Sequence, residues 1–203
     1  GVLYGFEPVS GKLKWSFDCN VPGAIDPFEA SAVDYENERH HFFGKPMVAG
    51  NVLYVALNHD LEVPVKAPLR AIQLDAGGEK PKQLWEFGPP EFKGTYTAAA
   101  AHRDVVFVTA HDCVVYAIDA KTGEKLWDAQ IDFAHDRSLS GDPVVHEEKL
   151  YVPGSMSVTV FEAAREKKCL GRYEFESWYP STPHFSGGRM YMTAGDAVYA
   201  LET

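Results

Sequence analysis

The chain has 203 residues, a formal net charge of −10, and a hydrophobic content of 45%. This composition is typical of a folded globular protein, not a disordered one, and no apolar run reaches the length of a membrane span. The acidic balance argues against nucleic-acid binding, because phosphate neutralisation needs clustered Lys and Arg.

Residues 1–18 predict two strands, at 2–6 and 12–17, joined by a turn at Ser10-Gly11. These two strands form the second half of a four-stranded repeat. Residues 20–44 show no strand pattern and carry a cluster of acidic residues. We expect an inserted loop there, for which a functional role and a surface decoration are equally consistent.

Four further repeats follow, at 45–88, 95–132, 141–177 and, incompletely, 181–203. Each opens with a short strand, a turn and an aromatic-rich strand. The distance from Phe107 to Tyr151 is 44 residues and that from Tyr151 to Tyr191 is 40 residues. This period indicates a four-stranded propeller blade.

A hairpin motif closes each repeat and is most regular at residues 117–127, Ala-Ile-Asp-Ala-Lys-Thr-Gly-Glu-Lys-Leu-Trp. Its Gly permits a positive φ in the turn, and its Trp can bury about 150–250 Å² against a neighbouring blade. Copies occur at 5–15, at 71–85 and, with Tyr in place of Trp, at 160–173. We expect structural docking roles, with the three Trp largely buried, for Gly11, Trp15, Trp85, Gly123, Trp127 and Tyr173.

This motif resembles the tryptophan-docking motif of the pyrroloquinoline-quinone-like propeller repeat family. The resemblance covers nearly the whole chain and points to the C-terminal half of quinoprotein-type or outer-membrane-assembly-type proteins of bacterial cell envelopes. It implies an all-β fold: a β-propeller of four-stranded antiparallel blades, about four to five of an expected eight, in a single partial domain at 1–203.

The predicted strands number two, then three sets of four, then three, so the array is not expected to close by itself. We expect other polypeptide, either the missing half of the propeller or a second copy, to cover both terminal flanks. The flanks are lined by Val2, Tyr4 and Phe6 at one end, and by Met190, Met192 and Val198 at the other.

Three His-Asp pairs fall in loops that an antiparallel blade places on one rim. The pairs suit metal ligation or acid–base chemistry, but capping of turns in contact with water explains them more simply. We therefore predict a candidate binding rim whose histidines do not converge on a metal ion. Its residues are His59, Asp60, His111, Asp112, His135 and Asp136.

The three cysteines, Cys19, Cys113 and Cys169, are far apart and are interpreted mainly as buried thiols. Quinone-dependent alcohol dehydrogenases contain similar repeats, but they hold their cofactor with a pair of adjacent cysteines. This chain has no such pair. No haem-attachment, GxSxG, HExxH, P-loop or dinucleotide motif occurs either. We therefore assign no catalytic residue, metal or cofactor.

The leading prediction is a non-catalytic scaffold that binds protein partners in the periplasm or cell envelope. The main alternative is a fragment of a quinone-dependent oxidoreductase whose cofactor residues lie outside this chain. A third interpretation, carbohydrate binding, depends only on aromatic residues of the rim, Phe28, Tyr35, Trp178 and Tyr179.

Overall fold

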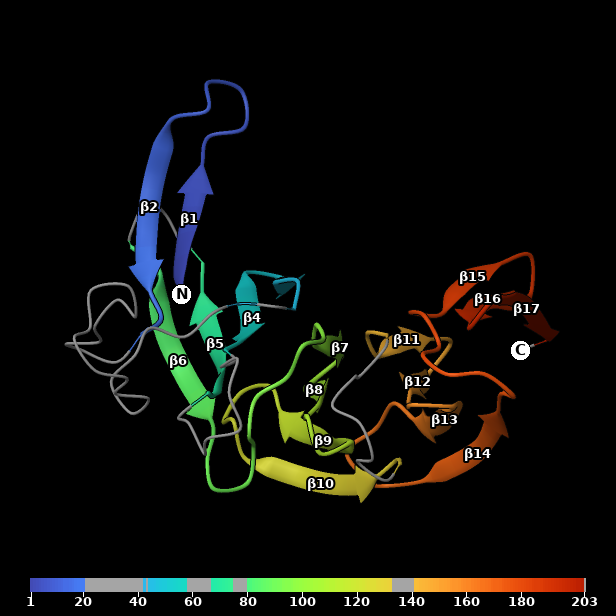
Figure 1. Cartoon of the computed structure of the whole chain (residues 1–203). Helices are drawn as coiled ribbons and strands as arrows, with labels where there is room; N and C mark the ends of the chain where they lie inside the picture. Colours follow the sequence, from blue (N-terminus) through green and yellow to red (C-terminus); the bar gives the residue numbers. More distant parts are fainter. Residues whose placement is uncertain (21–41, 43, 58–66, 75–79, 133–140, 203) are drawn as a thin grey trace, which may run out of the picture. The chain divides into compact units, whose positions relative to one another are not determined.

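The computed structural model describes residues 1–20, 42, 44–57, 67–74, 80–132 and 141–202. These residues form antiparallel β-sheets and contain no helix (Figure 1). The chain divides into two compact units, residues 1–94 and 95–203, and each is described by itself. The expectation of one partial domain over 1–203 therefore stays a prediction.

The first unit contains a two-stranded and a four-stranded sheet, each in sequential antiparallel order. The first pairs β1 (Val2–Phe6) with β2 (Leu13–Asp18). The second consists of β3 (Met47–Ala49), β4 (Val52–Ala56), β5 (Leu69–Gln73) and β6 (Lys82–Phe87).

The second unit contains two four-stranded sheets and one three-stranded sheet, again in sequential order. The first of these sheets has β7 (Ala100–His102), β8 (Val105–Thr109), β9 (Val114–Asp119) and β10 (Lys125–Gln130). The next has β11 (Val144–His146), β12 (Lys149–Pro153), β13 (Ser157–Glu162) and β14 (Cys169–Glu174). The last has β15 (His184–Ser186), β16 (Arg189–Ala194) and β17 (Ala197–Glu202).

The sheets confirm the predicted all-β fold of four-stranded antiparallel blades, and the described residues form the series of two, four, four, four and three strands. The sequence pattern places the opening strands at Lys45, Thr97, Asp142 and Thr182. In the structure they begin two or three residues later, at Met47, Ala100, Val144 and His184. In three of these repeats a proline stands just before the strand, where its missing N–H disfavours ladder pairing. Gly11 and Gly123 have φ of +69° and +77°, as their turns were expected to require.

Each unit has its own apolar core. In the first unit Leu3 and Cys19 from the β1–β2 end pack with Leu53, Val55 and Ile72. In the second unit one cluster joins the β7–β10 and β11–β14 sheets, and another joins β11–β14 to β15–β17. Stacked sheets that share apolar residues in this way are the packing expected of blades.

The cysteine prediction is correct for two residues and wrong for the third. Cys19 and Cys113 are buried and Cys169 is exposed, and all three are free thiols. Burial raises the pKa of Cys19 to about 11 and also raises the pKa of Cys113, which keeps both thiols protonated and unreactive at neutral pH.

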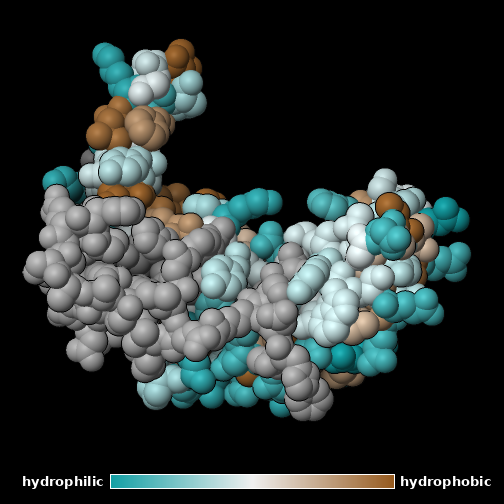
Figure 2. Space-filling model, in the orientation of Figure 1, coloured by the Kyte–Doolittle hydropathy of each residue, from teal (hydrophilic) through white to brown (hydrophobic). Residues whose placement is uncertain are grey.

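The N-terminal flank has its predicted lining at Tyr4 and Phe6, whereas the C-terminal flank differs from its predicted lining. Tyr4 and Phe6 are exposed on β1, and Figure 2 shows apolar patches on this hairpin. Met190 and Met192, however, are buried against the β11–β14 sheet, because β16 alternates and turns these side chains inward. Of the three residues expected on that flank, Val198 alone is exposed.

Candidate functional site

The rim of the second unit is the edge that carries the blade-to-blade connections and the second-to-third-strand turns. Backbone hydrogen bonds link these loops to one another. The Tyr179 N–H donates to the Ser155 carbonyl at 2.8 Å, and the Gly195 N–H donates to the Trp178 carbonyl at 2.9 Å. Three loops from two sheets are thereby fixed at one edge, as the predicted geometry of a blade requires.

Side chains extend this network around the rim. The Asp142 carboxylate accepts from the Ala98 N–H at 2.7 Å, and the Asp142 N–H donates to the Thr182 hydroxyl at 2.9 Å. The Asp132 carboxylate accepts from the Ser155 N–H at 3.0 Å. Each connection is thus bonded to the next loop along the rim, which gives a rigid platform instead of independent loops.

His111 and Asp112 lie in the β8–β9 turn at this rim. The His111 ring packs edge-on against Tyr96, with ring centroids 4.2 Å apart. Burial lowers the pKa of His111 below its ordinary range, and the nearby Asp112 carboxylate partly opposes that effect. His111 is therefore mainly neutral at pH 7 and packed on an aromatic ring.

The other predicted rim residues, His59, Asp60, His135 and Asp136, lie outside the described residues, as do Phe28 and Tyr35. Convergence of the three His-Asp pairs therefore stays untested. Among the residues that the structure describes, no three His, Cys, Asp or Glu side chains are grouped so that they hold a metal ion.

Trp178 and Tyr179 form an exposed aromatic pair on the rim, each 47% exposed, with ring centroids 6.2 Å apart. Tyr179 has φ +61°, a strained conformation for a bulky residue, and the hydrogen bonds of residues 178 and 179 to the neighbouring turns hold it there. A rigid pair of large aromatic residues in contact with water is a typical anchor of a binding surface.

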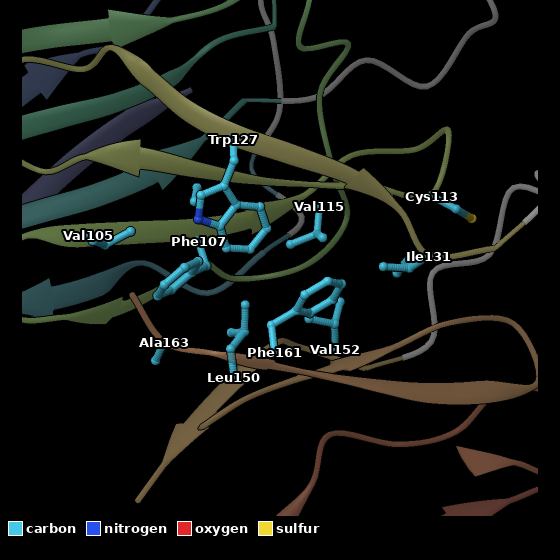
Figure 3. Close-up of a cluster of buried hydrophobic side chains, with 11 residues drawn as sticks. Val105, Phe107, Cys113, Val115, Trp127, Ile131, Leu150, Val152, Phe161 and Ala163 are labelled. Atoms are coloured by element: carbon cyan, nitrogen blue, oxygen red, sulfur yellow. The ribbon is translucent and has the colours of Figure 1, made fainter. Parts of the chain in front are cut away.

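The tryptophan-docking geometry is clearest at Trp127, which Figure 3 shows among its apolar neighbours. Its side chain is 7% exposed. Its ring lies 5.8 Å from that of Phe107 in its own sheet and 5.5 Å from that of Phe161 in the next sheet. Its indole N–H donates to the Ala164 carbonyl at 3.0 Å. Trp127 therefore contacts both its own sheet and the next one, and its docking role stays a prediction.

The other motif positions vary. Trp85 is buried beside Tyr54, and Trp15 is partly buried over Gly5, where a Cβ would overlap the indole. The expectation for Tyr173 needs correction. Its side chain is 43% exposed, and the neighbouring Phe175 is buried instead, against Tyr199 of the last sheet.

The opposite edge of these sheets carries the turns between first and second strands and between third and fourth strands, and we call it the turn edge. It carries charged residues that the sequence analysis did not single out. Arg165 donates at 2.7 Å to both Asp104 and Asp119, which belong to the preceding sheet. The hydrogen bond from Arg165, followed by the backbone N–H of Thr122, lowers the pKa of Asp119 to about 2. A groove of about 540 Å³ opens there, but paired charges line much of it, including Arg103 with Glu148 at 2.8 Å.

Comparison with known proteins agrees with this architecture. BamB from Moraxella catarrhalis superposes with a TM-score of 0.69 at 17% identity, over 98% of this chain and 52% of that one. A quinohemoprotein alcohol dehydrogenase from Comamonas testosteroni gives a TM-score of 0.55 at 18% identity, over 76% of this chain and 29% of that one. At these identities the likeness shows the fold alone.

A polyvinylalcohol dehydrogenase from a Pseudomonas species is 26% identical over an alignment of 175 residues, and the match covers 78% of this chain and 21% of that enzyme. This chain thus spans about half of the BamB protein and a fifth of the dehydrogenase. The family model described as outer membrane protein assembly factor BamB matches residues 1–203. The chain belongs to that family, which agrees with the resemblance of its tryptophan-docking repeats.

Proposed function

We propose that this chain forms part of a non-catalytic propeller scaffold that binds protein partners in the bacterial cell envelope. The observation that carries the proposal is the exposed Trp178–Tyr179 pair on a rim whose loops are bonded together. Aromatic anchors on a rigid frame favour protein contact, since little conformational entropy is lost on binding. Membership of an assembly-factor family supports both the scaffold role and the envelope location.

Within the described ranges the structure contains no helix with the length and apolarity to cross a membrane. The protein partner itself is not identified by the residues of the rim. Its contact is proposed to centre on Trp178 and Tyr179, with the surrounding bonded loops supplying the outer part of the interface.

Site-specific photocrosslinking tests this proposal. A photoreactive phenylalanine analogue at position 178 should give discrete protein adducts in intact cells, whereas the analogue at exposed Lys167 on the turn edge should not. The Tyr179→Ala substitution combined with the probe at 178 should weaken the adducts. The absence of adducts at position 178, or equal adducts at 167, would contradict binding through the rim.

The second candidate is a part of a quinone-dependent oxidoreductase, and the sequence likeness to a polyvinylalcohol dehydrogenase favours it. The described residues do not fit a quinone held with a metal ion, because they offer no group of three metal-ligating side chains. Saturable binding of pyrroloquinoline quinone plus calcium, followed by absorbance, would support this candidate against the scaffold.

A further inference from the structure

The second unit has two junctions between neighbouring sheets, and they differ in one aromatic side chain. The first junction lies between β7–β10 and β11–β14, and the second between β11–β14 and β15–β17. At the first junction Trp127 fills the space between the sheets. At the second junction there is a groove of about 400 Å³.

Strand register identifies the residue that stands at the tryptophan position in the second junction. Trp127 pairs with Ala117 directly after a bulge in the β9–β10 ladder. In the β13–β14 ladder the residue directly after the equivalent bulge is Gly171, which pairs with Val160. Gly171, and not Tyr173, is therefore the counterpart of Trp127. A Cβ added to Gly171 would meet nothing within 4 Å.

The groove is built from the counterparts of the residues that surround Trp127. The residues that surround Trp127 include Phe107 and Ala117 from its own sheet, and Leu150 and Phe161 from the next sheet. By strand position their counterparts are Tyr151, Val160, Met190 and Leu201, and all four line the groove. The second junction thus keeps the apolar surroundings of a docking tryptophan but has a glycine in its place.

We propose that the groove at Gly171 binds an aromatic side chain, of tryptophan type, that a partner protein inserts. The first junction shows what such surroundings accommodate, because an indole lies between the same strand positions one blade earlier. A groove of this size lies in the range of small-ligand sites, and one inserted aromatic residue is the usual form of an interface anchor. The inference rests on the proposed binding function, since the occupant is a residue of a protein partner.

The test uses the whole 203-residue chain and the tripeptide acetyl-Gly-Trp-Gly-amide as the probe. Titration followed by NMR should shift the Gly171 amide and the Met190 and Leu201 signals in a saturable way. The matched peptide with Ala for Trp should not produce these shifts. Gly171→Trp fills the groove with the chain's own indole and should weaken peptide binding at least about tenfold. Gly171→Leu serves as a second blocking variant if the Trp variant does not fold.

Tyr4→Ala is the matched control, because it removes an exposed aromatic residue of the first unit, leaves the groove unchanged and should keep wild-type peptide affinity. Equal peptide binding by wild type and both Gly171 variants would overturn the proposal. Tight binding of free indole without binding of the tripeptide would also overturn it, since the groove would then serve a small molecule. Peptide binding at Gly171 without crosslinks from position 178 would refute the rim contact alone, so the two proposals fail separately.

Discussion

The two junctions of the second unit are built from the same strand positions but are closed in different ways. At the first junction Trp127 is 7% exposed, lies between Phe107 and Phe161, and donates its indole N–H to the Ala164 carbonyl. At the second junction Gly171 has no side chain to contribute, and the sheets meet instead through Phe175 and Tyr199, 4.9 Å apart. A repeat scaffold can therefore keep its sheet geometry while one residue decides whether a junction is filled or open.

The turn edge adds further contacts between the two sheets of the first junction. At the first junction Arg165 reaches back to Asp104 and Asp119, and Lys167 donates to the Asp128 carbonyl at 3.0 Å. These contacts begin in the β13–β14 turn, which lacks the Thr-Gly pair of the regular motif. This turn, which departs from the repeat pattern, thus supplies contacts between the two sheets.

Trp127→Ala should give the largest loss of stability in the second unit. The substitution removes a buried aromatic ring and its hydrogen bond and leaves a cavity, with an expected cost of about 3–5 kcal/mol. Urea unfolding of the whole chain measures the difference in the free energy of unfolding. Far-UV circular dichroism is the suitable signal, because it reports on the backbone and does not depend on tryptophan fluorescence.

Tyr173→Ala is the matched control, since this exposed ring stands two residues beyond the glycine that occupies the tryptophan position. It should cost less than about 1 kcal/mol. If both substitutions cost the same, the two junctions would not differ in the way that their packing indicates.

Gly171→Trp should make the second junction resemble the first. An indole at this position would cover Met190 and Leu201, and filling a groove in this way typically adds about 0.5–2 kcal/mol. Removal of a strand glycine contributes in the same direction. The same unfolding measurement gives the answer, and a destabilised variant would show that the groove does not accommodate the ring.

The sequence was sufficient for the strands and their grouping, because period, alternation and turn glycines are local signals. It failed at Tyr173. The aromatic residue nearest to the expected spacing appeared to be the docking residue, and only the ladder register, with its bulge at Leu170, shows that Gly171 holds the position.

The candidate site was harder to predict for a similar reason. Trp178 and Tyr179 were noted in the sequence, but their exposure depends on hydrogen bonds to the turns at Ser155 and Gly195 in other parts of the chain. The partners of Arg165 are likewise distant in sequence, so no local pattern indicates them. The bonding of rim loops to one another follows from blade geometry, whereas the choice of side chain at each loop does not.

Asp119→Asn should weaken the first junction in a pH-dependent way. The pKa of Asp119 is lowered to about 2, so its charge stabilises the fold above about pH 4 and this contribution is lost as the pH falls from about 4 to 2. The wild type should exceed the variant by about 1 kcal/mol at pH 7, after allowance for solvent screening, and by much less at pH 2, where the Asp119 carboxyl is only partly ionised. Unfolding curves at several pH values test this, and a difference as large at pH 2 as at pH 7 would place its origin elsewhere.

The smallest expected effect concerns His111, which lies on the rim of the sheet that carries Trp127. Burial lowers its pKa, so protonation opposes folding and stability falls as the pH drops below the ordinary value of about 6.5. Tyr96→Ala removes the ring packed on the imidazole and should move the pKa of His111 back toward 6.5. NMR titration of the His111 ring protons measures the shift. An unchanged pKa would mean that the packing of Tyr96 does not keep water from this imidazole, and that the desolvation arises from the β8–β9 turn itself.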